Sequence, residues 1–206
     1  MTDVDHIESS RMLLAKTTRE MAEIGHSPAT GGNYSLKVSA TEILITASGK
    51  DKRTLQPADT ILVDLDGKPL QPGKPSDETL LHCQIYRELP QIHAVVHTHT
   101  VYATILSEYF RLDGKIEISG LEMIKSIEGF RSHEETLSIP LYPNSQNIPV
   151  LTREIHEHFA NPPVFPGYLL SGHGLYTWGK DLFTAKRHAE GIEFLLECKY
   201  RQLSLL

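Results

Sequence analysis

The first stretch of the chain carries apolar residues at helical spacing. Ile7, Leu14 and Met21 recur every seven residues, and Gly25, a residue type common just past helix ends, follows them. This pattern predicts a helix from near Asp3 to Ile24 whose apolar face packs on the rest of the fold.

The middle of the chain alternates between short β-rich segments and helical patterns. Strands are expected over 34–38, 42–47, 60–64, 94–100, 136–141, 168–170 and 175–179, with a hairpin turn at Asp66-Gly67. Helices are expected from a cap at Ser76, from Val101, over 121–127, up to Phe159, and from a cap at Asp181 to the end. This order predicts an α/β fold in which helices cover a central, mostly antiparallel sheet.

Composition and length restrict the class of protein. A chain of 206 residues suits a single domain, here 1–206, built around one core. The net charge of −6 and the absence of a basic stripe argue against a nucleic-acid partner. The chain shows no long apolar run and no signal-peptide pattern, so we expect a cytoplasmic protein without a membrane partner. Cys83 and Cys198 have no zinc-site or disulfide-framework spacing, and we expect them to pack on helix faces.

His97 and His99 are the strongest candidates for metal ligands. They lie in a Val-rich segment that is typical of a buried strand, where residues two apart point to the same side and can share one ion. Core or hydrogen-bonded histidines are the alternative interpretation. His156 and His158 have the same spacing, but the apolar residues around them recur every four positions. On such a helix, residues two apart diverge, so this second pair is not expected to chelate.

A third ligand is indicated at His173, which stands between Gly172 and Gly174. Flanking glycines allow a tight turn and a close approach of the backbone to a bound group. Three histidines without a nearby cysteine match an open, catalytic zinc site better than a closed structural one. An oxygen-activating iron site usually combines two histidines with a carboxylate, and no strand here has a His-x-Asp or His-x-Glu pattern.

Three other segments suggest an anionic substrate. The segment 31–35 contains Gly32 and Asn33, and the segment 47–50 contains Ser48, Gly49 and Lys50, whose charge favours an anion. Either loop could equally owe its composition to turn geometry. Ser76, at a predicted helix start, could also face an anion, although the two acids that follow it oppose a second negative charge.

Taken in order, five motifs resemble the class II aldolase and adducin family: Gly32-Asn33, Ser48-Gly49, Pro75-Ser76-Asp77-Glu78, His97-Thr98-His99 and Gly172-His173-Gly174. The ordered set spans most of the chain and is specific, although its pieces are not. The resemblance implies an αβα domain that assembles as a homotetramer. It also implies one Zn²⁺ per subunit on His97, His99 and His173, and a sugar-phosphate substrate whose phosphate is held near Gly32-Asn33 and Ser48-Gly49.

The resemblance leaves two acids as candidates for the proton transfer. The segment 121–125 is similar to the dehydratases of the family, which implies Glu122 as the catalytic acid and base. The family's aldolases use the acid of the Pro-Ser-x-Glu element, where Glu78 stands. A glutamate that performs both proton transfers near neutral pH needs a raised pKa. Because Glu78 is present as well as Glu122, a sugar-phosphate aldolase or epimerase is the alternative enzyme. Adducin-like interaction modules are expected to lack the metal histidines, and all three are present here.

Overall fold

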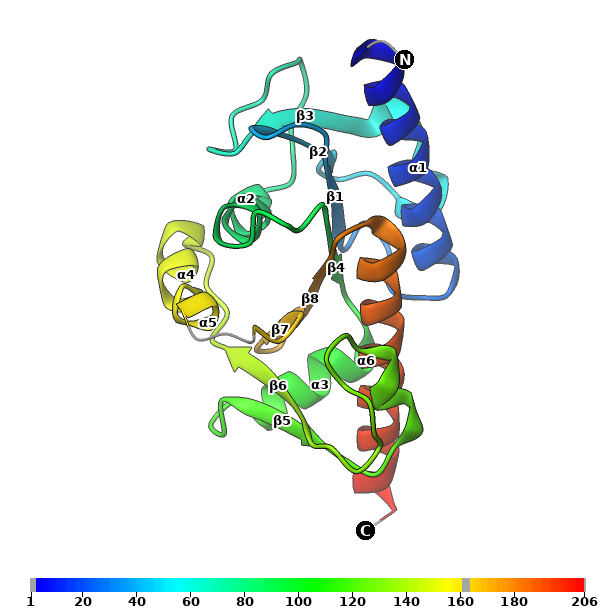
Figure 1. Ribbon diagram of the computed structural model, residues 1–206, viewed down its shortest axis with the longest axis vertical. Helices are drawn as coiled ribbons and strands as arrows, with labels where there is room; N and C mark the ends of the chain where they lie inside the picture. Colours follow the sequence, from blue (N-terminus) through cyan, green and yellow to red (C-terminus); the bar gives the residue numbers. More distant parts are fainter. Residues whose placement is uncertain (1–2, 161–163, 206) are drawn as a thin grey trace.

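The computed structural model describes residues 3–160 and 164–205 of the chain. In these parts, eight strands form one sheet in the order β3-β2-β1-β4-β8-β7-β6-β5, which runs through the middle of the molecule (Figure 1). Neighbouring strands are antiparallel except for β6 and β7, which are parallel. The strands are β1 (Asn33–Lys37), β2 (Glu42–Thr46), β3 (Thr60–Asp64), β4 (Ala94–Thr98), β5 (Lys115–Ile118), β6 (Leu137–Tyr142), β7 (Gly167–Leu170) and β8 (Gly174–Gly179).

Helices cover both faces of this sheet. The long helices α1 and α6 lie on one face with α3, and α2, α4 and α5 lie on the other (Figure 1). Their bounds are α1 (Asp3–Glu23), α2 (Thr79–Glu88), α3 (Val101–Tyr109), α4 (Ile148–Ile155), α5 (Glu157–Ala160) and α6 (Leu182–Ser204). Three 3₁₀ turns complete the described elements: η1 (Lys52–Thr54), η2 (Pro57–Asp59) and η3 (Glu122–Ser126). None of the described helices combines the length and the apolar character needed to cross a membrane. The predicted α/β class with a central, mostly antiparallel sheet is confirmed.

The core shows why β4 carries alternating side chains to opposite faces. Val95 packs in the cluster beneath α2 and α4, whereas its neighbour Val96 packs in the cluster beneath α1 and α6. His97 is two residues beyond Val95, so its side chain lies on the α2 face of the sheet. This alternation determines the face on which the functional site is built.

Several predicted elements differ in the structure. Helix α2 begins at Thr79 rather than directly after Ser76, and Glu78 occupies its N-cap position without a capping hydrogen bond from its side chain. The stretch 121–127 forms the 3₁₀ turn η3 instead of a full helix. Strand β5 has no counterpart in the sequence analysis. The predicted cap at Asp181 is confirmed, because its carboxylate accepts a hydrogen bond from the backbone N–H of Thr184.

Candidate metal centre and active site

Three histidines meet at one point on the α2 face of the sheet. His97 lies in β4, His99 directly follows that strand, and His173 lies in the turn between β7 and β8. The Nε2 atom of His97 is 2.8 Å from Nε2 of His99 and 3.4 Å from Nε2 of His173. The strand argument for His97 and His99 therefore agrees with their geometry, and the β7–β8 turn brings in His173.

Glu78 is the fourth member of this cluster. Its Oε1 is 3.2 Å from Nε2 of His173, and its Oε2 is 3.4 Å from Nε2 of His97. One donor atom from each of the four residues lies within 4.8 Å of the others. In a tetrahedral zinc site with bonds of about 2.0–2.1 Å, neighbouring donor atoms are roughly 3.3 Å apart. The spacing and the nitrogen-rich donor set therefore fit Zn²⁺.

The protonation states of the imidazoles also suit a metal. The Nδ1 atom of His97 lies 3.0 Å from the carbonyl oxygen of Leu175, which can only accept, so Nδ1 carries the proton and Nε2 presents its lone pair. Burial holds the pKa of His97 well below its usual range, and burial together with nearby His173 lowers the pKa of His99 to about 4. Neutral imidazoles of this kind are metal ligands.

The backbone around His99 is held from the α6 face. The N–H of His99 donates to the carbonyl oxygen of His26. The hydroxyls of Thr98 and Thr100 donate to the two oxygens of the buried Glu193 at 2.5 and 2.6 Å. Burial raises the pKa of Glu193 to about 7, against the two hydroxyl hydrogen bonds that lower it. Glu193 thus fixes Thr98 and Thr100, the two neighbours of His99. The helical pattern around Glu193 does not predict this role.

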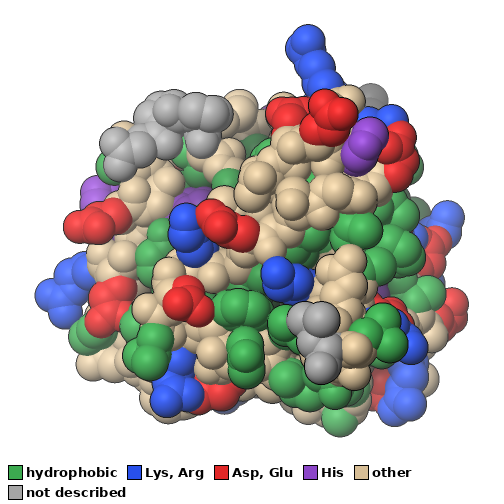
Figure 2. All heavy atoms as spheres, turned by 90° about the horizontal axis from the view of Figure 1, so that it is seen from below, with side chains coloured by type: hydrophobic (Ala, Val, Ile, Leu, Met, Phe, Trp, Pro, Cys, Tyr) green, Lys and Arg blue, Asp and Glu red, His purple; other side chains and the backbone are tan. Residues whose placement is uncertain are grey.

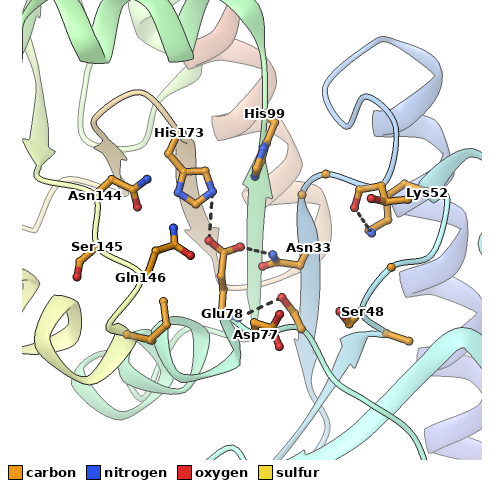
Figure 3. Close-up of a pocket in the computed structure, with 17 residues that line it drawn as sticks. Asn33, Ser48, Lys52, Asp77, Glu78, His99, Asn144, Ser145, Gln146 and His173 are labelled. Carbon is orange, nitrogen blue, oxygen red and sulfur yellow. Dashed lines mark hydrogen bonds and ion pairs between the residues drawn. The ribbon is translucent and has the colours of Figure 1, made fainter.

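A pocket of about 410 Å³ opens beside the cluster (Figure 3). The predicted substrate residues that line it are Gly32, Asn33, Ser48, Gly49 and Ser76, and the predicted catalytic acid Glu78 lines it as well. Gly32 is required there, since its φ is +75° and an added Cβ would lie 2.7 Å from the carbonyl oxygen of His97. The pocket wall also includes Asn144, Ser145 and Gln146, which precede α4 and carried no signal in the sequence analysis.

The positive charge of this pocket comes from Lys52 rather than from Lys50. The Nζ of Lys50 forms an ion pair with Asp59 at 2.8 Å, its side chain is half exposed, and Lys50 does not line the pocket. Lys52 lines the pocket and is buried, and its Nζ donates to the carbonyl oxygens of Thr30 and Lys50 at 2.9 Å each. Figure 3 shows Lys52 across the pocket from His173. Lys50 and Lys52 would point to the same side only in an extended strand. Here the chain enters η1 at Lys52, so the two side chains point in different directions.

Glu122 lies away from the cluster. It begins η3, and Ile124 of this turn and Ile127 directly after it pack in the same apolar cluster as Ile192 of α6. The sheet therefore separates η3 from the metal ligands. The Glu122 side chain is two-thirds exposed and pairs with Lys125 and His133. Its hydrogen bond with Lys125 lowers the pKa of Glu122, whereas the sequence argument required a raised pKa. Within one chain, the structure brings Glu78 and not Glu122 to the metal ligands.

The second His-x-His pair behaves as the helix argument predicts. His156 ends α4 and its Nδ1 lies 2.7 Å from a carboxylate oxygen of Glu88. His158 belongs to α5 and its Nε2 donates to the carbonyl oxygen of Phe165. The two rings therefore have separate partners instead of converging on one point.

Comparison with known proteins agrees with this geometry. Residues 12–200 match the family described as Class II Aldolase and Adducin N-terminal domain. A relative from Xylella fastidiosa (strain M12), named methylthioribulose-1-phosphate dehydratase, is 41% identical over 98% of this chain and 93% of its own length. A relative of the same name from Marinobacter nauticus is 41% identical over 97% of this chain and 96% of its own length.

Solved structures show the same fold. An L-fuculose 1-phosphate aldolase superposes with a TM-score of 0.77 at 21% identity, covering 95% of this chain and 87% of that one. An L-fuculose-1-phosphate aldolase from Thermus thermophilus superposes with a TM-score of 0.75 at 23% identity, covering 99% and 98%. With the family match over most of its length and the histidine cluster in place, the chain belongs to the class II aldolase and adducin family.

Proposed function

We propose that this chain is a hydro-lyase that converts 5-methylthioribulose 1-phosphate to 2,3-diketo-5-methylthiopentyl 1-phosphate, a step of methionine salvage. The observation that carries the proposal is the cluster of three histidines beside a polar pocket, in a chain 41% identical to proteins named for this reaction. We take the whole chain, 1–206, as one catalytic domain. The cytosol is the compartment we propose, in keeping with its two free cysteines.

One Zn²⁺ per subunit would be held by His97, His99 and His173, with Glu78 against the same point. The bound ion supplies a Lewis acid that polarises the substrate's carbonyl group. The chain's own residues supply the rest. The pocket walls fix the sugar, and a carboxylate removes the proton from C3 and delivers a proton to the hydroxyl that leaves C4 as water.

The phosphate group is assigned to the end of the pocket near Lys52. The buried ammonium group of Lys52 donates to the carbonyl oxygens of Thr30 and Lys50, which carry no net charge, so a phosphate dianion can neutralise its positive charge. Ser48, Gly49 and Ser76 line the same pocket and add polar groups. A phosphate bound there would lie across the pocket from His173, with the reacting carbons of a five-carbon sugar between the two.

We further propose that Glu122 acts in the site of a neighbouring subunit of a homotetramer. The sheet keeps Glu122 from the metal ligands of its own chain, but its exposed side chain is available to another chain. Helix α3 supports such assembly, because Val101, Ile105 and Tyr109 are exposed at helical spacing on its outer face, and Leu112 is exposed in the turn that follows. Figure 2 looks onto the end of the molecule where β5 and β6 lie and shows hydrophobic side chains exposed there between charged ones.

A sugar-phosphate aldolase or epimerase is the second candidate, and one observation favours it. Glu78, the acid that the resemblance assigns to the family's aldolases, is the carboxylate that touches His97 and His173. An assay of the purified, zinc-loaded protein on 5-methylthioribulose 1-phosphate separates the candidates. A dehydratase forms one diketone product, an aldolase releases two smaller fragments, and an epimerase leaves the mass unchanged. An adducin-like interaction module would show none of these reactions.

A further inference from the structure

A chain of hydrogen bonds runs from Glu78 into the core beneath α2. Nδ2 of Asn33 donates to Oε2 of Glu78 at 2.6 Å, and Oδ1 of Asn33 lies 2.5 Å from Nε2 of His82. On the far side of the imidazole, Nδ1 of His82 lies 2.7 Å from the hydroxyl of Ser35, which lies 2.8 Å from the hydroxyl of Tyr86. These hydrogen bonds connect buried residues of β1 and α2 to the cluster of candidate metal ligands.

The donor and the acceptor of each of these hydrogen bonds follow from the Glu78 carboxylate and from the protonation of His82. A carboxylate oxygen accepts, so the Asn33 amide must present its NH₂ group to Glu78 and its carbonyl oxygen to His82. His82 is fully buried and burial lowers its pKa to about 3, so the ring is neutral and carries one proton. That proton must be on Nε2 to reach Asn33. Nδ1 of His82 then accepts from Ser35, and Ser35 accepts from Tyr86.

We propose that His82 is a positioning residue of the active site, which holds the Asn33 amide in one orientation and through it fixes the Glu78 carboxylate. With the other tautomer, His82 would turn a lone pair toward Asn33, and the amide would flip to set its oxygen against Glu78 at hydrogen-bond distance. The two oxygens of Glu78 face His97 and His173 separately, so losing the Asn33 donor frees the carboxylate to rotate away from them. The effect on catalysis rests on the proposed function. The tautomer of His82 follows from the hydrogen bonds alone and does not depend on which reaction the protein catalyses.

His188 provides a matched comparison within the same chain. It is also a fully buried, neutral histidine, but its Nδ1 donates to the carbonyl oxygen of Trp178 and its Nε2 accepts from the backbone N–H of Glu128. Burial lowers its pKa as well. His188 thus has the opposite tautomer, with the proton on Nδ1, and these hydrogen bonds do not connect it to Asn33 or Glu78.

The first test is ¹⁵N NMR of the imidazole nitrogens in the zinc-loaded protein near neutral pH. We expect His82 with its proton on Nε2 and His188 with its proton on Nδ1, each assigned by loss of its signals in the corresponding variant. A His82 ring protonated on Nδ1, or on both nitrogens, would overturn the proposal. This readout is independent of the substrate, so it stands even if the chain catalyses another reaction.

The second test compares three variants for zinc content and turnover. His82→Leu removes the donor to Asn33 and should lower kcat roughly 10-fold to 100-fold, the usual effect of losing a partner of this kind, while zinc is retained. His82→Gln can place an NH₂ group near the position of Nε2 and should recover most of that loss. His188→Leu loses a buried imidazole of the same kind and should lower the melting temperature while leaving kcat of the folded protein nearly unchanged.

Two outcomes of this comparison contradict the proposal. One is an unchanged kcat in His82→Leu, and the other is an equal loss of kcat in His82→Leu and His188→Leu, which would make the effect one of stability. If His82→Leu does not fold, Ser35→Ala takes its place, since it deletes only the hydroxyl that holds Nδ1 as an acceptor. Turnover of wild type on the proposed substrate is measured first, so a failure of the proposed function is seen separately.

Discussion

The histidine cluster makes a direct prediction for metal binding at the residue scale. Replacing His97, His99 and His173 together by alanine removes all three nitrogen donors and should abolish stoichiometric zinc, because Glu78 alone cannot hold the ion. Elemental analysis of the dialysed protein measures this. The control is His156→Ala with His158→Ala, which should retain about one zinc per chain. Zinc retained in the triple variant, or lost in the control, would contradict the assignment.

Lys52 and Lys50 give the second prediction at this scale. Lys52→Met removes the buried ammonium group of the pocket and should raise KM roughly 10-fold to 100-fold, the worth of a hydrogen bond to a charged group. Lys50→Met removes an ion pair with Asp59 outside the pocket and should change KM little. Steady-state kinetics of both variants check this. A larger effect at Lys50 would return the phosphate to the residue that sequence reasoning favoured.

At the residue scale, sequence reasoning succeeded where a periodic backbone fixes side-chain direction. His97 and His99 could be placed together because a strand repeats every two residues. The neighbouring Ser48 and Gly49 make Lys50 the cation that the sequence predicts for the phosphate, yet Lys52, at the start of η1, is the lysine that lines the pocket. His82 and Glu193 had no distinguishing pattern, since their partners are 49 and 93 to 95 residues distant in the sequence.

The loop that enters β1 gives a prediction at the scale of elements. Gly32→Ala should destabilise the fold, because the left-handed backbone costs about 1–2 kcal/mol for a residue with a Cβ and the new atom also overlaps the carbonyl oxygen of His97. Gly114→Ala is the control, since its φ is +67° and nothing lies near the added atom. Urea unfolding of the metal-free proteins should show the larger loss for Gly32→Ala. Equal losses would show that the close approach to β4 has no cost.

The order of the helices and strands could be predicted from the sequence, but the residues at which they begin and end could not. Helix α2 was expected from a Ser76 cap and starts at Thr79, which leaves Ser76 to line the pocket and Glu78 to turn its carboxylate toward the histidines. Residues 121–127 have helical spacing but form a 3₁₀ turn, because Ile124 and Ile127 pack against α6. Such deviations depend on tertiary contacts, which local patterns do not contain.

At the scale of the whole molecule, assembly decides whether Glu122 can act. Glu122→Gln alone should lower turnover by roughly 10²-fold to 10⁴-fold, the range that general acid–base catalysis supplies, and His97→Ala alone should be inactive because it lacks a metal ligand. If each site combines the metal ligands of one subunit with Glu122 of the next, refolding the two variants together should restore activity. In an equal mixture that assembles at random, about a quarter of the sites should recover, because a working site needs an intact His97 from one subunit and an intact Glu122 from its neighbour.

The control for this mixing experiment uses two lesions on the same side of the proposed site. A mixture of His97→Ala with His173→Ala should regain no activity, because both residues are metal ligands of the same chain and no subunit of the mixture has a complete metal site. Absence of recovery in the first mixture, with tetramers confirmed by their mass, would place the catalytic acid within a single subunit and favour Glu78.

The proposed loss of water from a sugar phosphate is tested most directly by the product that the purified, zinc-loaded protein forms. Mass spectrometry and ¹³C NMR of 5-methylthioribulose 1-phosphate after incubation should show a single product lighter by one water, with two adjacent carbonyl carbons and an intact carbon chain. Two shorter fragments, or an isomer of unchanged mass, would contradict the account and assign the site to the aldolase or epimerase reaction.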